Sequence, residues 1–369
     1  MDKMRIAYIA VKGIPIGGGI EKLTEEIGTR MVKKGHEVMV YCSRDYGTVD
    51  CEYRGMKIKT VSSVNTKSLH KISICYNATI DLIRRKGADV VHFHAVGPSI
   101  FSIIPRLKSI PTVVQAHGLE WKRDKWGVVG RTFFKLADYS AVYFPNKTTS
   151  VSKVQKQYYE KRFAKEIVYI PTGVNNVQSA EPEWILKQGL EPDRYIFFAA
   201  RLVEEKGAHF LVEAFRSIDT KLKLVIAGDA AHSEKYKAKL RDLAGDDKRI
   251  IFQGFITGQP LAELFSNAYL FCLPSTIEGL PIALLEAMSY GNCCVVSDIP
   301  ENLEAIESFG YTFQNRNPSD LKKVLEDLIL NPGKVQRKKD AARQHVLKKY
   351  SWEMIADQME SLYYSILKK

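Results

Sequence analysis

Glu278 and Glu286 are the residues of this chain whose type and spacing most directly indicate chemistry. A strand-like apolar stretch (269–274) leads to the first, and the second lies in an expected helix that Pro281 would open. One carboxylate would then sit above a strand and the other about a turn and a half along a helix. Because a helix N-terminus attracts phosphate, the pattern suits a nucleotide sugar. The alternative is a surface helix with two ordinary glutamates, since short patterns recur by chance.

A second cluster, Arg201 with Lys206 and Gly207, follows the expected strand 195–200. Arg201 offers a planar fork for phosphate oxygens, and Lys206 a mobile point charge. Together they could neutralise a departing diphosphate without a metal. Because no D-x-D pair occurs in the sequence, we expect no catalytic divalent ion and no other cofactor. As isolated surface charges, the two residues would mean little.

His117 follows another expected strand, 111–116, where a histidine could donate to a sugar hydroxyl or shuttle a proton. The alternative is a histidine satisfied by backbone groups. His92 and His94 share one strand face and could in principle bind a metal. Since no third ligand is evident, we expect packing for His92 and a site-lining role for His94.

A third loop, Gly17-Gly18-Gly19, joins the first expected strand (5–11) to the first helix (20–34). Its glycines would let the backbone approach a pyrophosphate closely and lead into a helix N-terminus. The loop is not G-x-G-x-x-G, and no acidic residue stands at the tip of the second strand (37–42) as a ribose ligand. A nicotinamide dehydrogenase is therefore disfavoured, and a merely flexible turn is the alternative.

These loops belong to strands and helices that alternate along the chain in two series. Further strands are expected at 89–94 in the first series and at 223–228, 250–253, 269–273 and 293–297 in the second. Such alternation predicts an α/β protein with two doubly wound, Rossmann-like domains. We place the first at 1–173, with the C-terminal helix 352–369, and the second at 174–351. Ligands bind beyond the carboxyl ends of such strands, so a cleft between the domains is the expected site.

Composition narrows the class of protein. The 369 residues carry a net charge of +12, of which residues 1–173 hold +14 (29 Lys+Arg against 15 Asp+Glu) and the remainder −2 (25 against 27). No nucleic-acid-binding signature accompanies the basic half, so an anionic membrane surface or a merely solvated face explains it better. No run approaches the ~20 apolar residues of a transmembrane helix. The six cysteines are expected to be reduced core residues.

Taken in order, these elements resemble the retaining GT-B glycosyltransferases of family 4 over nearly the whole chain. The matching segments are Gly17 to Glu21, Gly35 to Val38, Val168 to Val174, Arg201 with Lys206-Gly207, Gly228-Asp229, Gly254, and Pro274-Ser275 through Glu278 to Glu286-Ala-Met288. The resemblance implies a GT-B fold whose C-terminal helix crosses back to the first domain. It also implies transfer from a nucleotide diphosphate sugar with retention at the anomeric carbon.

The resemblance further assigns roles by position. Arg201 and Lys206 would stabilise the departing diphosphate, Glu286 would bind the ribose, and Glu278 and His117 would hold the transferred sugar. The expected catalytic residues are His117, Arg201, Lys206 and Glu278. The expected donor-binding residues are Gly17, Gly18, Gly19, Arg201, Lys206, Gly254, Phe255, Ile256, Glu278, Gly279, Leu280, Pro281, Ile282 and Glu286.

A narrower likeness, in the run from His117 to Gly127, is to a branch that includes rhamnosyltransferases of polysaccharide synthesis. Aromatic faces stack on sugars, and basic side chains suit a lipid-linked pyrophosphate. The expected acceptor-side residues are His94, Glu120, Trp121, Lys122, Arg123 and Trp126. The expected partners are thus a nucleotide-sugar donor, a glycan or polyprenyl-linked acceptor and an anionic membrane surface. This implies a cytoplasmic protein, peripheral on the inner face of the cell membrane.

Two further alternatives share this architecture. A nucleotide-sugar 2-epimerase has the same two domains, but Arg201 and Lys206 with this glutamate spacing argue against it. A non-catalytic nucleotide-sugar-binding protein is disfavoured because the phosphate-binding and carboxylate positions are all present.

Overall fold

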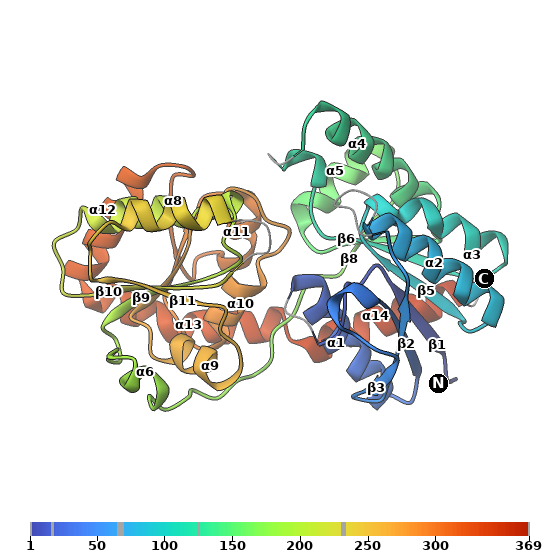
Figure 1. Cartoon of the computed structure of the whole chain (residues 1–369), viewed down its shortest axis with the longest axis horizontal. Helices are drawn as coiled ribbons and strands as arrows, with labels where there is room; N and C mark the ends of the chain where they lie inside the picture. The colour runs from blue at the N-terminus through green and yellow to red at the C-terminus, as the bar shows by residue number, and fades with distance from the viewer. Residues whose placement is uncertain (1, 16–17, 65–69, 124–125, 230–233, 368–369) are drawn as a thin grey trace. The chain divides into compact units, whose positions relative to one another are not determined.

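The computed structural model describes residues 2–15, 18–64, 70–123, 126–229 and 234–367. These residues form two compact units. Unit 1 comprises Met1–Gly173 and Trp352–Lys369, and unit 2 comprises Val174–Ser351. In each unit, helices cover both faces of a largely parallel sheet, as expected where strands and helices alternate (Figure 1).

Unit 1 holds, within its described residues, an eight-stranded sheet of order β3-β4-β2-β1-β5-β6-β7-β8. All neighbouring pairs are parallel except β3 with β4. Its elements are β1 (Arg5–Ile9), α1 (Gly19–Lys33), β2 (Glu37–Ser43), η1 (Arg44–Tyr46), β3 (Cys51–Tyr53), β4 (Met56–Val61), α2 (His70–Arg85), β5 (Val90–His94), η2 (Gly97–Ser102), α3 (Ile103–Leu107), β6 (Thr112–Ala116), η3 (Glu120–Lys122), α4 (Val128–Tyr143), β7 (Lys147–Ser150), α5 (Lys153–Phe163), β8 (Val168–Tyr169) and α14 (Trp352–Leu367).

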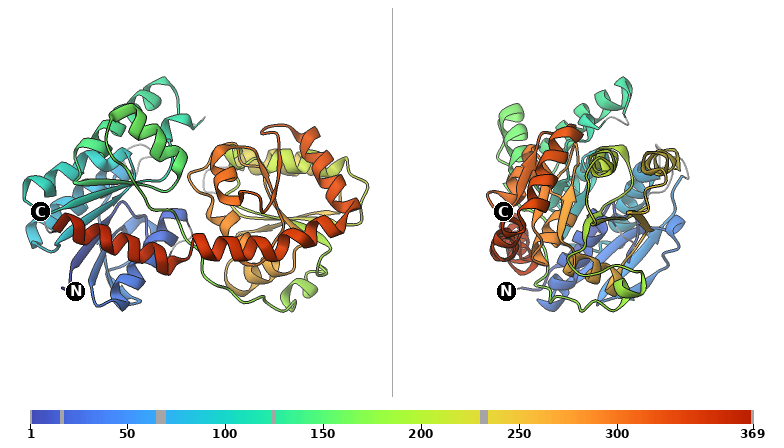
Figure 2. Two further views of the ribbon diagram at one scale, coloured as in Figure 1. Left: turned by 180° about the vertical axis from the view of Figure 1, so that it is seen from behind. Right: turned by 90° about the vertical axis from the view of Figure 1, so that its left-hand side faces the viewer.

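The central strand β1 is buried on both faces. Ile6 and Tyr8 pack with α1 and α14 on one face, and Ala7 and Ile9 pack with α2 on the other, following the two-residue period of a strand. The C-terminal helix α14 runs along unit 1 (Figure 2), and its Trp352 is 1% exposed. The last helix of the chain is thus part of the first unit's core.

Unit 2 holds, within its described residues, a six-stranded parallel sheet of order β11-β10-β9-β12-β13-β14. Its elements are α6 (Trp184–Lys187), β9 (Tyr195–Ala199), η4 (Glu204–Lys206), α7 (Ala208–Arg216), β10 (Lys223–Ala227), α8 (Glu234–Ala244), β11 (Ile250–Gly254), α9 (Gly258–Ser266), β12 (Leu270–Leu273), α10 (Ile282–Ser289), β13 (Cys294–Ser297), α11 (Pro300–Ile306), β14 (Tyr311–Phe313), α12 (Pro318–Leu330) and α13 (Pro332–Lys349).

The six cysteines are free, and five of them are buried. Cys51 is exposed, so the expectation that all six lie in the core is wrong at this position. It lies on β3, the edge strand of the sheet, which has a neighbouring strand, β4, on one side only. Side chains at such an edge are less covered than those of the central strands.

Candidate functional site

In unit 2, the loops that follow β9 and β12 pack directly on one another. Gly207 adopts a left-handed backbone conformation (φ 69°), and a Cβ there would lie 2.0 Å from the carbonyl oxygen of Pro274. Thr276 N–H donates to the carbonyl oxygen of Glu205 at 2.9 Å. Because only glycine permits this approach, Gly207 brings the two predicted site loops together.

That contact joins Lys206 to Glu278. The ammonium Nζ lies 2.5 Å from Oε1 of the carboxylate, and the two side chains are 16% and 7% exposed. Arg201, in the same loop, has a side chain that is 56% exposed and 3.4 Å from Glu205. The strand ends of unit 2 therefore present a sheltered ion pair beside an exposed guanidinium.

Helix α10 begins after the loop that carries Glu278. Pro281 is the residue before the helix, with an extended backbone (ψ 103°), and its carbonyl accepts from the N–H groups of Leu284 and Leu285. The prediction that Pro281 opens the helix as its first residue is therefore wrong by one position. Gly279 and Leu280 are buried in the loop, whereas Ile282 and Glu286 are partly buried on the helix. The first N–H groups of α10 thus follow Glu278 closely in the chain.

A pocket of about 290 Å³ lies at the carboxyl ends of β10 and β11. Gly228, at φ 142°, closes one side, where a Cβ would lie 1.8 Å from the carbonyl oxygen of Ala200. Its N–H donates to the carbonyl oxygen of Gly254 at 2.7 Å. Phe255 is exposed and Ile256 partly buried in the loop just beyond. The lining residues are Leu202, Ile226, Gly228, Asp229, Lys237, Arg241, Phe252, Gln253 and Gly254.

In unit 1, the predicted glycine loop is described only from Gly18 onward, and Gly17 lies outside the described residues. Gly18 has an extended backbone and precedes α1, which Gly19 opens. The carboxylate of Glu21 is buried near Gly18, and its Oε1 accepts from the N–H of Lys12 at 3.1 Å. This helix N-terminus therefore already holds a carboxylate close to the position where a pyrophosphate was predicted.

The predicted histidines of β5 and β6 form a stack inside unit 1. The rings of His92 and His94 lie 4.5 Å apart, and His94 Nδ1 lies 3.3 Å from Nε2 of the half-buried His117. His92 Nδ1 lies 2.7 Å from the hydroxyl of Tyr363 on α14. Burial lowers the pKa of both His92 and His117 to about 3, and it lowers the pKa of His94 well below its ordinary value.

These contacts correct one prediction. His94 was expected to line the site and His92 to be packed, yet both side chains are fully buried. The reason is that β5 is covered on both faces, and its residue His94 stacks on Tyr8 from the next strand. Only His117, in the loop after β6, keeps exposed surface.

The predicted acceptor segment forms η3 and the approach to α4. Trp121 packs against Tyr158, and the ammonium groups of Lys122 and Lys135 lie 5.8 and 5.2 Å from its ring centre. Trp126 packs on Phe134 with ring centres 4.9 Å apart, and Arg123 pairs with Glu120 at 3.0 Å. Both tryptophans are partly buried, so part of each ring packs within unit 1 and part stays open to solvent.

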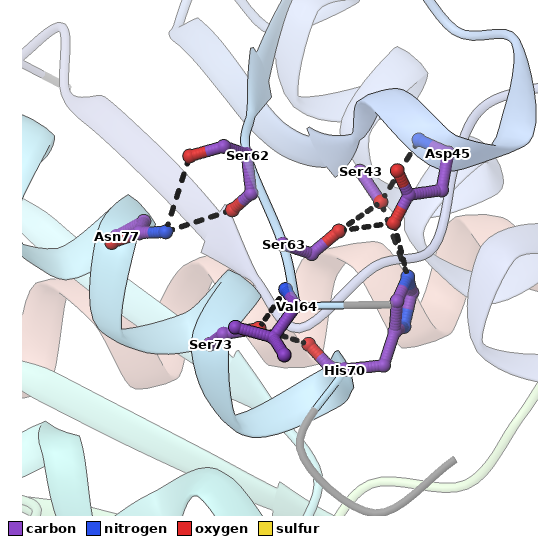
Figure 3. Close-up of polar contacts among 8 residues, drawn as sticks. All are labelled: Ser43, Asp45, Ser62, Ser63, Val64, His70, Ser73 and Asn77. Carbon is purple, nitrogen blue, oxygen red and sulfur yellow. Dashed lines mark hydrogen bonds and ion pairs between the residues drawn. The ribbon is translucent and has the colours of Figure 1, made fainter. Parts of the chain in front are cut away.

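One polar cluster in unit 1 was not predicted (Figure 3). His70 Nε2, at the start of α2, lies 3.0 Å from Oδ2 of Asp45 and 3.3 Å from Oγ of Ser43. The hydroxyl of Ser63 donates to Asp45 and, with His70, lowers the pKa of that carboxyl. Because one ring nitrogen faces both the serine and the aspartate, the cluster is not a Ser-His-Asp relay.

Further hydrogen bonds tie this cluster together. Asn77 donates to the carbonyl oxygen of Ser62 at 2.8 Å, and Val64 N–H donates to Ser73 (Figure 3). The cluster lies at the carboxyl ends of β2 and β4, where ligands bind in such sheets. The signal in the sequence was the short polar residues that directly follow each strand, Ser43 to Asp45 and Ser62-Ser63.

Among residues 2–15, 18–64, 70–123, 126–229 and 234–367, no three His, Cys, Asp or Glu side chains gather so that they could hold a metal ion. Over the same ranges, every helix is too short or too polar to cross a lipid bilayer.

Comparison with known proteins identifies the family. Residues 17–177 match the model of Glycosyltransferase Family 4, and residues 181–345 match the model of Glycosyl transferases group 1. The structure resembles sucrose-phosphate synthase from Thermosynechococcus elongatus, with a TM-score of 0.85 at 19% identity over 98% of this chain and 99% of that one. The chain belongs to the GT-B glycosyltransferases.

Three further proteins illustrate the range of this similarity. HepE of Anabaena, solved in complex with UDP and glucose, has a TM-score of 0.84 at 16% identity over 98% of this glycosyltransferase and all of that chain. An uncharacterised glycosyltransferase of Methanocaldococcus jannaschii is 30% identical over 47% of this chain and 45% of its own length. The α-1,3-galactosyltransferase of Escherichia coli, which by name transfers from UDP-Gal to GlcNAc-diphosphoundecaprenol, is 24% identical over 89% of this chain and 90% of its own.

Proposed function

We propose that this glycosyltransferase moves a sugar from a nucleoside diphosphate, bound by unit 2, to a lipid-linked or growing cell-surface glycan. Transfer would proceed with retention and without a divalent metal. The observation that carries the proposal is the Lys206–Glu278 pair, 2.5 Å long and sheltered at the strand ends of unit 2. A cation and a carboxylate held together at this edge suit a ligand that combines diphosphate with sugar hydroxyls.

The pair suggests a division of labour for the donor. Lys206 and the exposed Arg201 would neutralise charge that develops on the departing diphosphate, which is commonly the largest contribution to such catalysis. Glu278 would accept hydrogen bonds from the transferred sugar. Glu286, partly buried on α10, would accept from the ribose hydroxyls. The pocket beside Gly254 offers room for the base.

On unit 1, His117 would contact the transferred sugar. Because burial lowers its pKa to about 3, the ring is neutral near pH 7 and can both donate and accept. Gly18 and Gly19 would approach the diphosphate, and Glu120, Trp121 and Trp126 would lie toward the acceptor.

Two observations favour a lipid-linked acceptor. Residues 1–173 carry the chain's entire excess of positive charge, +14, which suits an acceptor with a pyrophosphate at an anionic membrane. The Escherichia coli relative is named for a diphosphoundecaprenol acceptor. We therefore propose a protein that works peripherally on the inner face of the cell membrane. Among donor sugars, rhamnose is the first to test, ahead of glucose, mannose and N-acetylhexosamine.

A thermal-shift screen with UDP, dTDP, GDP and ADP, each with and without EDTA, tests the donor. A ligand at a hundred times its Kd stabilises the folded protein by about 2.7 kcal/mol. We expect one nucleotide to raise the melting temperature equally in both conditions, and a response to dTDP would support rhamnose. A shift that EDTA abolishes would contradict metal independence, and no shift with any nucleotide would contradict the donor site.

The Glu286→Ala variant tests the ribose contact. Loss of a charge-assisted hydrogen bond should weaken binding of the responding nucleotide about tenfold or more. The matched control is Glu213→Ala, an exposed glutamate on α7 of the same unit. Equal affinities for the two variants, measured by calorimetry, would remove Glu286 from the site.

A further inference from the structure

Helix α4 of unit 1 leaves a row of large apolar side chains in contact with solvent. Val128 and Val129 are 82% and 85% exposed, and Leu136 is 65% exposed. Phe133, Tyr139 and Tyr143 continue the row, each more than two-fifths exposed. Single exposed apolar residues are ordinary, but six on one helix form a patch that indicates an interaction.

The spacing places this patch on one side of the helix. At about 100° per residue, the six residues fall within roughly 140° of the circumference. The opposite side packs into unit 1 through Ala137, Asp138 and Ala141, which are all buried. The helix is therefore apolar on two sides, and the core accounts for only one of them.

Basic side chains border the patch at α5, which packs beside α4 (Figure 1). Tyr139 and Tyr143 both pack against Phe163, the last residue of α5. Lys165 Nζ lies 5.7 Å from the ring centre of Tyr143, and Arg162 Cζ lies 5.3 Å from that of Phe163. We call the six exposed residues Val128, Val129, Phe133, Leu136, Tyr139 and Tyr143 the α4 face; Phe163 is itself buried.

The charge around the α4 face has one sign. Residues 126–165 contain eight Lys or Arg and two acidic residues, Asp138 and Glu160, a net of +6. Asp138 is buried and accepts from the hydroxyl of Tyr159 at 3.0 Å, and Glu160 pairs with Lys156 at 2.7 Å. Neither carboxylate opposes the basic rim, which includes Arg131 and Lys135 on α4 itself.

We infer that the α4 face is the surface by which this glycosyltransferase docks on an anionic lipid bilayer. A helix of this kind lies in the interface with its apolar side among the acyl chains and its lysines and arginines at the headgroups. Tyrosines favour the same depth because one end of the ring is apolar and the other polar. The inference gives the proposed membrane association a specific surface and does not depend on the donor chemistry.

Charge also decides between a bilayer and a second copy of the chain. Two copies that met through the α4 face would bring two rims of the same positive sign together. An anionic bilayer would neutralise that rim while it covered the apolar row. The lipid surface therefore satisfies both properties of the face at once.

Vesicle co-sedimentation of the full chain tests this inference. Vesicles of phosphatidylcholine mixed with the anionic lipid phosphatidylglycerol are compared with vesicles of phosphatidylcholine alone. We expect binding to the charged vesicles only, and weakening as salt rises. Leu136→Asp and Val129→Asp should each lower the partition coefficient at least about tenfold, because each places a carboxylate in the apolar layer.

Matched variants separate the α4 face from general effects. Leu330→Asp alters an exposed leucine of unit 2, 79% exposed, and should leave binding unchanged. Lys165→Glu should weaken binding to charged vesicles, whereas Lys221→Glu in unit 2 should not. Circular dichroism and nucleotide binding verify that each variant is folded. Failure of the native chain to bind charged vesicles, or equal binding by Leu136→Asp and Leu330→Asp, would overturn the inference. So would self-association that Leu136→Asp abolishes without any vesicle binding.

Discussion

The strand ends of the two sheets carry opposite kinds of polar chemistry. In unit 2, Lys206 and Glu278 form an ion pair that is sheltered but not sealed from water. In unit 1, His92, His94 and His117 form a stack whose pKa values all lie below the ordinary value, because burial disfavours the charged rings. Of the three, only His117, in the loop after β6, keeps exposed surface. One edge keeps its charges, and the other keeps its ionisable groups neutral.

The difference follows from what each edge can stabilise. A charge that is sheltered from water is costly without a partner, and Lys206 and Glu278 supply one another. Histidines packed ring on ring cannot all be protonated, since like charges 4 to 6 Å apart repel strongly away from water. A paired, charged edge suits a diphosphate, and a neutral ring with exposed surface, such as His117, suits the hydroxyl groups of a sugar.

The largest expected effect is on the charged edge. Lys206→Ala should lower the turnover number about 10²- to 10³-fold, the usual cost of losing one donor that stabilises developing charge. The same change at Lys187, an exposed lysine of α6 in unit 2, should leave turnover unaltered. Steady-state rates with saturating donor check this prediction.

A parallel change on the neutral edge sharpens the comparison. If His117 acts through a hydrogen bond to the sugar, His117→Gln should raise KM for the sugar nucleotide more than it lowers turnover. Lys206→Ala should show the reverse balance. If the two variants changed KM and turnover in the same proportion, His117 and Lys206 would not have the separate roles of binding the sugar and stabilising the departing diphosphate.

Gly207→Ala should be next in size, because it disturbs the loop contact that forms the ion pair. The new Cβ would lie 2.0 Å from the Pro274 carbonyl oxygen at a φ of 69°. Gly189 has the same φ with nothing within 4 Å of its Cβ position, so Gly189→Ala measures backbone strain alone. We expect strain of about 1 kcal/mol or more at both sites and a larger loss at Gly207. Equal losses of unfolding free energy for the two variants, measured in denaturant melts, would show that the loops after β9 and β12 can move apart without cost.

Much of the fold was predictable because buried parallel strands and amphipathic helices leave strong periodic signals. The runs around Tyr8 and Phe197 are nearly all apolar, and both form central strands. The assignment of a GT-B architecture is confirmed. Helix starts were less predictable, since Pro281 suits both the first helical position and the one before it, and backbone geometry decides between them.

The site was predictable only where chemistry and chain position coincide. Lys206 and Glu278 each follow a strand, and parallel strands place such residues at one edge. In the cluster of Asp45 and His70, the serines and the aspartate also follow strands, but His70 does not. Its place there depends on how the start of α2 lies against the ends of β2 and β4. Burial of His94 was likewise not readable from its spacing, since it results from the stacking of Tyr8 on the neighbouring strand.

The neutral histidines also predict a dependence of stability on pH. The pKa values of His92 and His117 fall to about 3 on folding, against about 6.5 for an unperturbed histidine. Between these values the unfolded chain binds more protons than the native one, so stability rises with pH. The contribution of the neutral rings is complete above about pH 6.5 and is lost as pH falls toward 3. Each ring adds at most about 1.4 kcal/mol per pH unit to the slope of the free energy of unfolding against pH.

Denaturant melts of the native chain and of His92→Gln, taken between pH 7.5 and 5, measure this slope. The three histidines together contribute part of the slope of unfolding free energy against pH. Removing one ring should reduce that part by about a third, whatever the substitution does to stability at pH 7.5. NMR titration supplies an independent readout, because a buried neutral ring should show no change in its Cε1–H shift down to pH 5. A histidine of the stack that titrates near pH 6.5 would show that water reaches the rings. The two units would then differ there only in their residue types, and burial would not explain the difference from Lys206 and Glu278.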